Sequence, residues 1–283
     1  MKKIALSFIS LALLVVGFIS CDKVTDIYET PPEPVDSRRK ILIEDFTGHK
    51  CGNCPRAARL IYDSLQNIYP EQIISYGVHA GFYARPLPLP GLGCDTVDYR
   101  CDAGNKWDTL FQVTAQGNPT GMVNRTDYNA NNDQVKYASE WPSAVATLLQ
   151  REAEAIIDIE NTYNSSTRAL TTTVKTDFLK SLSGTYKLVI VITEDNLVSC
   201  QKDDDATPVI VQDYVHRHVL RGAINGNYGE AIVLNPEEGD SESKTYSLVL
   251  NSSWVDVNCS VVAFVFNENT NEIVQVDEKK LTE

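Results

Sequence analysis

Apolar and polar positions divide the chain into stretches with different patterns. Residues 4–20 are uncharged and mostly apolar, whereas residues 22–40 include three prolines and show no apolar periodicity. From residue 41 short apolar runs flank a stretch with helical spacing, and from residue 154 the apolar positions follow a period of two. That period is typical of a strand with one buried face. An α/β domain at 41–153 and an all-β domain at 154–283 are therefore predicted.

The order of elements in residues 41–153 predicts the beginning of a βαβ unit. Strands are expected at 41–46 and 73–78, separated by a helix with Pro55 in its first turn, where a missing N–H costs nothing. A closing helix is expected within 138–153. The first helix is indicated by apolar residues at helical spacing, namely Ala57, Leu60, Ile61 and Leu65.

Residues 154–283 predict short strands separated by clusters of Asn, Asp, Gly and Ser. The expected strands are 155–159, 170–174, 186–192, 209–211, 246–250, 260–266 and 273–276. Seven such strands favour an antiparallel β-sandwich of immunoglobulin-like type. A length of 283 residues fits two domains of this size.

The first 20 residues predict a signal peptide that is removed. Lys2 and Lys3 precede an apolar run shorter than the about 20 residues that a membrane-spanning helix needs. Residues 18–20, Phe-Ile-Ser, stand before Cys21 and resemble a bacterial lipobox. This resemblance implies a lipid on Cys21 that anchors the protein to a membrane, with residues 21–40 as a tether. The alternative is cleavage near Ser20 that leaves Cys21 as a free thiol.

Charge and motif content exclude several classes of function. The formal net charge is −13, which argues against a nucleic-acid partner because phosphate binding needs clustered Lys and Arg. No Gly-rich phosphate loop is present, and no cofactor is predicted. His216 and His218 share one strand face, but two histidines favour a packed or solvated pair over a metal site. The run Asp203 to Asp205 lacks the pattern of a calcium loop and predicts a solvated turn.

Cys51 and Cys54 form a Cys-x-x-Cys pair at the start of the first predicted helix. Unpaired amide groups and the helix dipole favour an anion there, so Cys51 is predicted to be a reactive thiolate and Cys54 the residue that resolves a mixed disulfide. The alternatives are a permanently oxidised pair without redox activity and a zinc site, which would need two further ligands.

The remaining cysteines are predicted to form structural disulfides. Lipidation of Cys21 would leave six of the seven cysteines, and exported proteins meet an oxidising compartment. The predicted pairs are Cys94–Cys101 and Cys200–Cys259. The second pair closes the longer loop, and longer loops give a larger entropic stabilisation in the chain-entropy model.

Residues 41–153 resemble the thioredoxin superfamily at further positions. Asp45 lies six residues before Cys51, where thioredoxins carry a buried acid that takes a proton from the resolving cysteine. Gly117-Asn118-Pro119-Thr120 looks like the cis-proline loop of that family, which lies against the disulfide and presents backbone to a substrate chain. The resemblance implies that Asp45, Cys51 and Cys54 are catalytic. It also implies that Asn118, Pro119 and Thr120 bind substrate.

The whole chain is similar to a family of Bacteroidetes lipoproteins, those related to outer membrane protein 28. The lipobox and the segments 51–55, 117–121 and 213–221 carry this resemblance. It implies an outer membrane lipoprotein on either the periplasmic or the cell-surface face. Two functions are expected, of which the first is thiol–disulfide exchange on exported proteins. The alternative is a non-catalytic binding or structural role, favoured by Lys50 in place of an aromatic residue and by the long segment 80–104.

Overall fold

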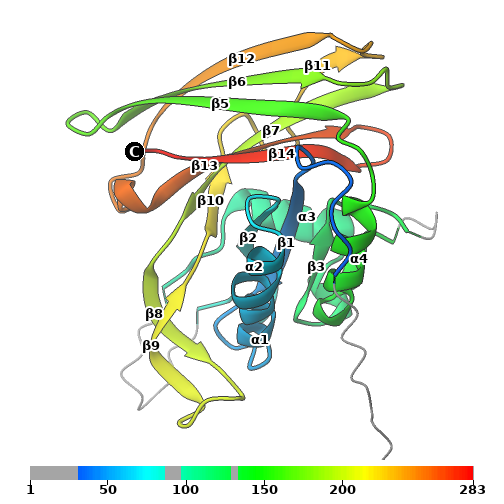
Figure 1. Ribbon diagram of the computed structural model, residues 1–283. Helices are drawn as coiled ribbons and strands as arrows, with labels where there is room; N and C mark the ends of the chain where they lie inside the picture. The colour runs from blue at the N-terminus through cyan, green and yellow to red at the C-terminus, as the bar shows by residue number, and fades with distance from the viewer. Residues whose placement is uncertain (1–30, 87–96, 129–132, 283) are drawn as a thin grey trace, which may run out of the picture. The chain divides into compact units, whose positions relative to one another are not determined.

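A computed structural model describes residues 31–86, 97–128 and 133–282 (Figure 1). The chain divides into two units, Met1–Pro31 and Pro32–Glu283. The predicted signal peptide, the lipidation site Cys21 and most of the tether lie outside the described residues, as does Cys94. Among the described residues, no helix combines the length and the apolar character that crossing a membrane requires.

The first half of Pro32–Glu283 contains all of its described α-helices. Its elements in chain order are β1 (Ile41–Thr47), α1 (Cys54–Arg59), a π-helical continuation (Leu60–Leu65), α2 (Gln66–Ile68), β2 (Ile73–His79), α3 (Asp102–Phe111), a 3-10 turn (Thr114–Gln116), β3 (Thr120–Val123), β4 (Val135–Tyr137), a 3-10 turn (Ala138–Glu140) and α4 (Trp141–Leu149). The predicted strands at 41–46 and 73–78, a helix at the apolar positions from Ala57 to Leu65 and a helix within 138–153 are confirmed, with Leu60–Leu65 in π-helical form.

The second half consists of strands. They are β5 (Ala155–Asn164), β6 (Ala169–Phe178), β7 (Thr185–Glu194), β8 (Leu197–Lys202), β9 (Ile210–His216), β10 (Val219–Ala223), β11 (Glu230–Leu234), β12 (Ser241–Val249), β13 (Cys259–Asn267) and β14 (Ile273–Lys280), with a 3-10 turn at Asp256–Asn258. All seven predicted strands are present. The sequence pattern missed β8, β10 and β11, and it also missed α3, in which Gly104 and Asn105 lower the helix propensity.

Strands from both halves join in one mixed sheet. Its nine described strands follow the order β14-β13-β7-β10-β2-β1-β3-β4, with β11 also paired to β7. β2 is parallel to β1 and to β10, whereas the other pairs are antiparallel. The predicted boundary at residue 153 falls in the link between α4 and β5. Whether the two halves are separate domains stays a prediction, although β2 and β10 pair across that boundary.

Helices cover both faces of the sheet around β1. Alternate residues of a strand point to opposite faces, and Ile41 and Ile43 pack with α1 and α4, while Leu42 and Phe46 pack in the core that contains Trp107 of α3. A third core lies between the sheet β12-β6-β5 and the strands β7, β13 and β14. Figure 1 shows these strands as two layers. The second half is therefore a pair of antiparallel layers.

A buried ion pair links the core of the first half to the second. Arg125 donates from Nε and Nη2 to the two carboxylate oxygens of Glu44, at 2.7 Å each, and both side chains are at most 3% exposed. Tyr76 donates its hydroxyl to Glu44 at 2.8 Å. The Arg125 guanidinium also lies 5.0 Å from the ring of Trp107 and 4.9 Å from that of Phe264 on β13.

β8 and β9 form a separate two-stranded hairpin that leaves the large sheet after β7 and returns to it at β10. In Figure 1 it extends beside α1. Neither β8 nor β9 has a regular alternation of buried and exposed residues, which explains why the sequence pattern indicated only the short run at 209–211. This β8–β9 hairpin supplies one wall of the candidate site.

Candidate functional site

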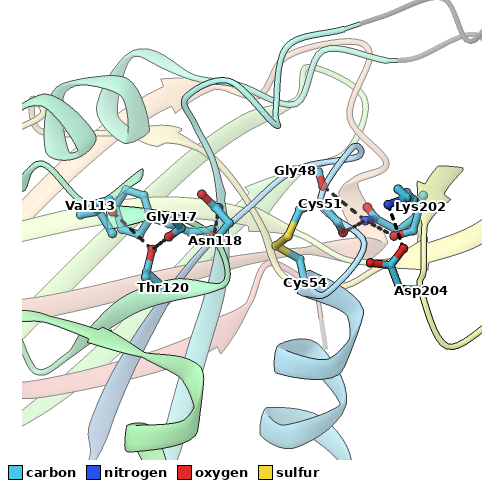
Figure 2. Close-up of a disulfide and its surroundings, with 11 residues drawn as sticks. Gly48, Cys51, Cys54, Val113, Gly117, Asn118, Thr120, Lys202 and Asp204 are labelled. Atoms are coloured by element: carbon cyan, nitrogen blue, oxygen red, sulfur yellow. Dashed lines mark hydrogen bonds and ion pairs between the residues drawn. A yellow bond between two sulfur atoms is a disulfide. The ribbon is translucent and has the colours of Figure 1, made fainter. Parts of the chain in front are cut away.

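Cys51 and Cys54 form a disulfide at the beginning of α1 (Figure 2). The turn after β1 brings Cys51 into position, since its N–H donates to the carbonyl of Gly48 at 3.0 Å. Cys54 is the first residue of α1, and Pro55 follows it as expected. The exposed fractions of the two cysteines are only 4% and 2%. The pair therefore has the predicted place in the chain, but its sulfur atoms are covered.

The β8–β9 hairpin covers the disulfide loop on one side. Two backbone hydrogen bonds of 2.8 Å join them, from Lys202 N–H to the carbonyl of His49 and from Asp204 N–H to the carbonyl of Gly52. The amide of Gln201 donates to the carbonyl of Cys51 at 3.0 Å. A Cβ atom on Gly52 would meet the carboxylate of Asp204, whose side chain would have to turn aside.

Charged side chains hold the tip of the same hairpin to α1. Arg59 donates to Asp203 at 2.7 Å and to Asp205 at 2.7 Å, and Arg56 donates to Asp205 at 2.6 Å. The predicted solvated turn is therefore wrong in one respect: the Asp203 side chain is almost buried and paired. The reason is tertiary, because the arginines that neutralise these acids lie on a helix far away in the sequence.

The loop predicted to be a cis-proline loop has a cis peptide bond between Asn118 and Pro119. Asn118 donates its amide to the carbonyl of Phe46 at 2.6 Å, which fixes the loop to β1. The hydroxyl of Thr120 donates to the carbonyl of Gly117 at 2.6 Å, and its side chain is fully buried. Figure 2 draws this loop on one side of the disulfide and Asp204 on the other.

Asp45 is buried on β1 and faces a cavity that Cys54 also lines. Burial raises the pKa of its carboxyl from 3.8 to about 7, and no described residue forms a hydrogen bond with its Oδ1 atom. The cavity has a volume of about 290 Å³ and lies between α1, the ends of β1 and β2 and the β8–β9 hairpin. A buried acid whose pKa is raised by desolvation therefore shares a cavity with Cys54.

Three buried histidines meet beside this cavity, and the sequence analysis did not bring them together. His49 lies in the turn before the disulfide, His79 ends β2 and His216 ends β9. Each is at most 5% exposed, and one nitrogen atom of each lies within 4.8 Å of the others. Desolvation lowers the pKa of all three, that of His216 to about 3, which keeps the rings neutral.

The predicted relationship between His216 and His218 is not what the structure shows. His218 lies apart from the cluster, stacked on Tyr62 with ring centres 5.6 Å apart and with its Nδ1 atom 3.1 Å from Asp195. The partners of His216 come from other elements, so spacing along one strand could not have identified them. The available signal was weaker: His49 and His79 lie just after predicted strands, whereas the predicted strand nearest His216 ends at residue 211.

Neither predicted structural disulfide forms. Cys101 and Cys259 are free thiols, while Cys200 is disulfide-bonded, though not to Cys259. Cys101 caps α3, where its sulfur accepts the Gly104 N–H at 3.4 Å. Cys259 begins β13 in the large sheet, whereas Cys200 lies in the β8–β9 hairpin. Loop length predicted which pairing would stabilise most, but strand topology determines which thiols can meet.

The chain is similar to known outer membrane proteins. The profile of the family described as outer membrane protein Omp28 matches residues 105–283. This match includes Pro119 and the β8–β9 hairpin, whereas Asp45, Cys51 and Cys54 precede it. No curated protein matches the chain.

Solved structures give weaker likenesses. A domain of the outer membrane lipoprotein Omp28 from Porphyromonas gingivalis is 25% identical, with 46% of this chain and 88% of that chain covered and a TM-score of 0.33. A β-glucosidase from Kluyveromyces marxianus is 13% identical over 46% of this chain and 15% of that chain, with a TM-score of 0.20. TM-scores this low do not establish a shared overall fold.

Proposed function

Because the chain belongs to the family of the outer membrane protein Omp28, we propose that this outer membrane lipoprotein exchanges thiols and disulfides with exported proteins through Cys51 and Cys54. The observation that carries the proposal is the cavity shared by Cys54 and the buried acid Asp45. A buried acid with a pKa of about 7 beside a disulfide is suited to exchanging a proton with the leaving or attacking sulfur.

The lipid anchor is part of this proposal. A lipid on Cys21 would hold the protein at the membrane, and the following residues to 40 would separate the folded unit from the surface. The family membership and the lipobox support this arrangement. It would place the redox pair where secreted and membrane proteins acquire their disulfides.

The proposed reaction starts from the oxidised pair. A substrate thiolate attacks the Sγ atom of Cys51, the Cys51–Cys54 bond breaks, and the Cys54 thiolate takes a proton from the Asp45 carboxyl. A second substrate thiolate then attacks the substrate sulfur of the mixed disulfide and releases Cys51 as a thiolate. The substrate dithiol is thereby oxidised and the Cys51–Cys54 pair reduced; the reverse sequence reduces a substrate disulfide.

Pro119 would shape the surface on which a substrate chain docks. The cis peptide at Asn118–Pro119 and the hydrogen bond from Asn118 to β1 support this role. Thr120 would act through its backbone, because its side chain is buried and its hydroxyl is engaged. A thioredoxin-like first half and an immunoglobulin-like second half belong to the same proposal, supported by the strand–helix–strand order and by the two antiparallel layers.

Access to the sulfur atoms requires the β8–β9 hairpin to move. The salt bridges between its tip and α1 are partly exposed and therefore screened by salt. The described contacts that would have to be replaced are the backbone and amide bonds of residues 201, 202 and 204 and the contact between the Cys200 carbonyl and the His49 ring. A substrate that replaces these contacts with its own backbone would reach Cys51.

A second candidate function is favoured by the burial of both sulfur atoms. In that case the disulfide is a permanent link within a scaffold, and the protein binds partners through its β layers. The two functions differ in the chemistry of one bond, so the redox properties of the pair distinguish them.

The deciding experiment measures the reduction potential of the pair and insulin reduction by the mature protein, its Cys51→Ser variant and its Asp45→Asn variant. Redox activity predicts a potential above about −300 mV, loss of insulin reduction in Cys51→Ser and a slower rate in Asp45→Asn. A potential well below that value, with equal and negligible rates for all three proteins, would establish the scaffold role.

A further inference from the structure

We propose that His49, His79 and His216 form a zinc site with a fourth coordination position open to the cavity beside the disulfide. This site is independent of thiol chemistry, since all three ligands are imidazoles. The three residues come from the turn after β1, the end of β2 and the end of β9, and the fold brings them together.

The distances fit an ion with little rearrangement. One nitrogen atom of each ring lies within 4.8 Å of the others, and the ring centres of His49 and His216 are 5.0 Å apart. With Zn–N bonds of about 2.0–2.1 Å, tetrahedral geometry places ligand nitrogen atoms about 3.4 Å apart. Rotations of the side chains would have to bring the three nitrogen atoms closer together to reach this spacing.

His79 gives an independent indication of a ligand. Its side chain is 3% exposed, and neither of its ring nitrogen atoms has a hydrogen-bond partner in the described part of the chain. Buried polar groups are almost always satisfied, because an unpaired one loses its bonds to water without replacement. A metal ion at the centre of the cluster would give one of the two His79 nitrogen atoms a partner.

The other two rings are held by outer contacts of the kind that orient metal ligands. His216 contacts the Ser199 hydroxyl through Nε2 at 3.0 Å, so Nδ1 is its candidate ligand atom. His49 has Nδ1 3.0 Å from the carbonyl of Cys200 and Nε2 2.9 Å from that of Val97. A neutral imidazole carries one N–H and can donate to only one of these carbonyls, so the other nitrogen would bind an ion once the ring turns it away from the carbonyl that it faces.

The donor set selects the class of metal. Three neutral imidazoles suit zinc and related transition-metal ions, whereas magnesium and calcium take oxygen ligands. His79 and His216 both line the cavity, so a fourth ligand would come from solvent or from a small molecule there. Asp45 lines the same cavity and would supply negative charge near the ion, which partly offsets the nearby Arg221.

Zinc binding by the mature full-length protein in detergent tests the proposal. Equilibrium dialysis against Zn²⁺, with Mg²⁺ as a control ion, should give one Zn²⁺ per chain and no Mg²⁺. His79→Gln and His216→Gln should each weaken binding about 100-fold or more. His218→Gln is the matched control and should bind as the wild type does. A Cys51→Ser/Cys54→Ser variant should also retain binding, which separates this site from the thiols and from the proposed exchange activity.

A measurement on the wild type covers the case in which a variant fails to fold. Nitrogen-15 spectra of the four imidazoles should show three rings shifted by Zn²⁺ and His218 unchanged. The proposal is overturned if the wild type takes up no stoichiometric Zn²⁺, if a folded His79→Gln protein binds as tightly as the wild type, or if zinc shifts none of the three rings.

Discussion

The backbone N–H of Lys202 donates to the carbonyl of His49 at 2.8 Å, so the β8–β9 hairpin is bonded directly to the segment that leads into the disulfide. The same hairpin ends at His216, whose ring lies 5.0 Å from that of His49. One ribbon thus covers the Cys51–Cys54 pair and supplies the third histidine of the cluster. Access to the disulfide and integrity of the histidine cluster depend on the position of this hairpin.

Removing the arginines that hold the hairpin should expose the disulfide. In an Arg56→Gln/Arg59→Gln variant, both side-chain links from α1 to Asp205 are lost, as is the link to Asp203. After mild reduction we expect alkylation of Cys51 to be several-fold faster than in the wild type, and we expect high salt to accelerate the wild type similarly. Arg100→Gln is the control, since Arg100 pairs locally with Asp98. Equal rates in all proteins would mean that the backbone bonds alone determine access.

Asp45 should make stability depend on pH in a defined direction. The folded-state pKa, about 7, lies above the ordinary value of 3.8, so the folded protein holds this proton more tightly. The contribution of Asp45 to the free energy of unfolding is therefore favourable below about pH 4. It declines as the pH rises to 7 and stays low above that pH. Asp45→Asn should remove this decline and raise the free energy of unfolding at pH 8 by at most about 4 kcal/mol.

Urea unfolding of the wild type and Asp45→Asn at pH 5 and pH 8 checks this prediction. The difference between the two proteins isolates Asp45 from other titrating groups, the buried histidines included. A constant difference at both pH values would show that the carboxyl is not buried as described.

The pair Glu44–Arg125 should be sensitive to the loss of one partner. Arg125→Met would leave the Glu44 carboxylate buried without its counter-charge, and we expect a loss of about 3–5 kcal/mol in the free energy of unfolding. A second change, Glu44→Gln, should recover part of the loss because it removes the unpaired charge. Lys180→Met, which breaks the exposed pair with Glu152, should have almost no effect. Denaturant unfolding of these three variants and of the wild type measures the difference.

Cys101 and Cys259 should be present as unreactive thiols in the native protein. Burial raises the pKa of both, that of Cys259 to about 12, so little thiolate exists at pH 8. Iodoacetamide should modify neither residue in the folded, unreduced protein and both after unfolding in urea without reductant. Peptide mass spectrometry measures the modification at each site. Failure of Cys259 to react in the unfolded, unreduced chain would restore the Cys200–Cys259 disulfide.

The lipid anchor should depend on Cys21. A Cys21→Ser variant would lack the acceptor for the lipid, and we expect it to leave the membrane fraction while its folded unit is unchanged. Fractionation of cells that express each protein, followed by immunoblotting, checks the prediction. Wild-type and variant proteins found equally in the membrane fraction would contradict a lipid on this residue.

The sequence by itself determined where most strands of the second half lie and where α1 begins. Apolar patterns identified seven of the ten described strands of the second half, and Pro55 after Cys54 identified the beginning of α1. The resemblance to thioredoxins implied a buried acid at Asp45, and the carboxyl is buried. Residue spacing succeeds here because strand and helix periods fix which face a side chain occupies within its own element.

Only the tertiary structure decided which elements meet. Segments far apart in the chain meet where β2 pairs with β10, where the β8–β9 hairpin covers the disulfide and where the three histidines cluster. The same packing keeps Cys101 and Cys259 as free thiols. Periodicity carries no information about strand order, because the same alternating strand can pair with any neighbour that buries its apolar face. The order is fixed by how the whole set of faces packs together, and a single segment does not contain that information.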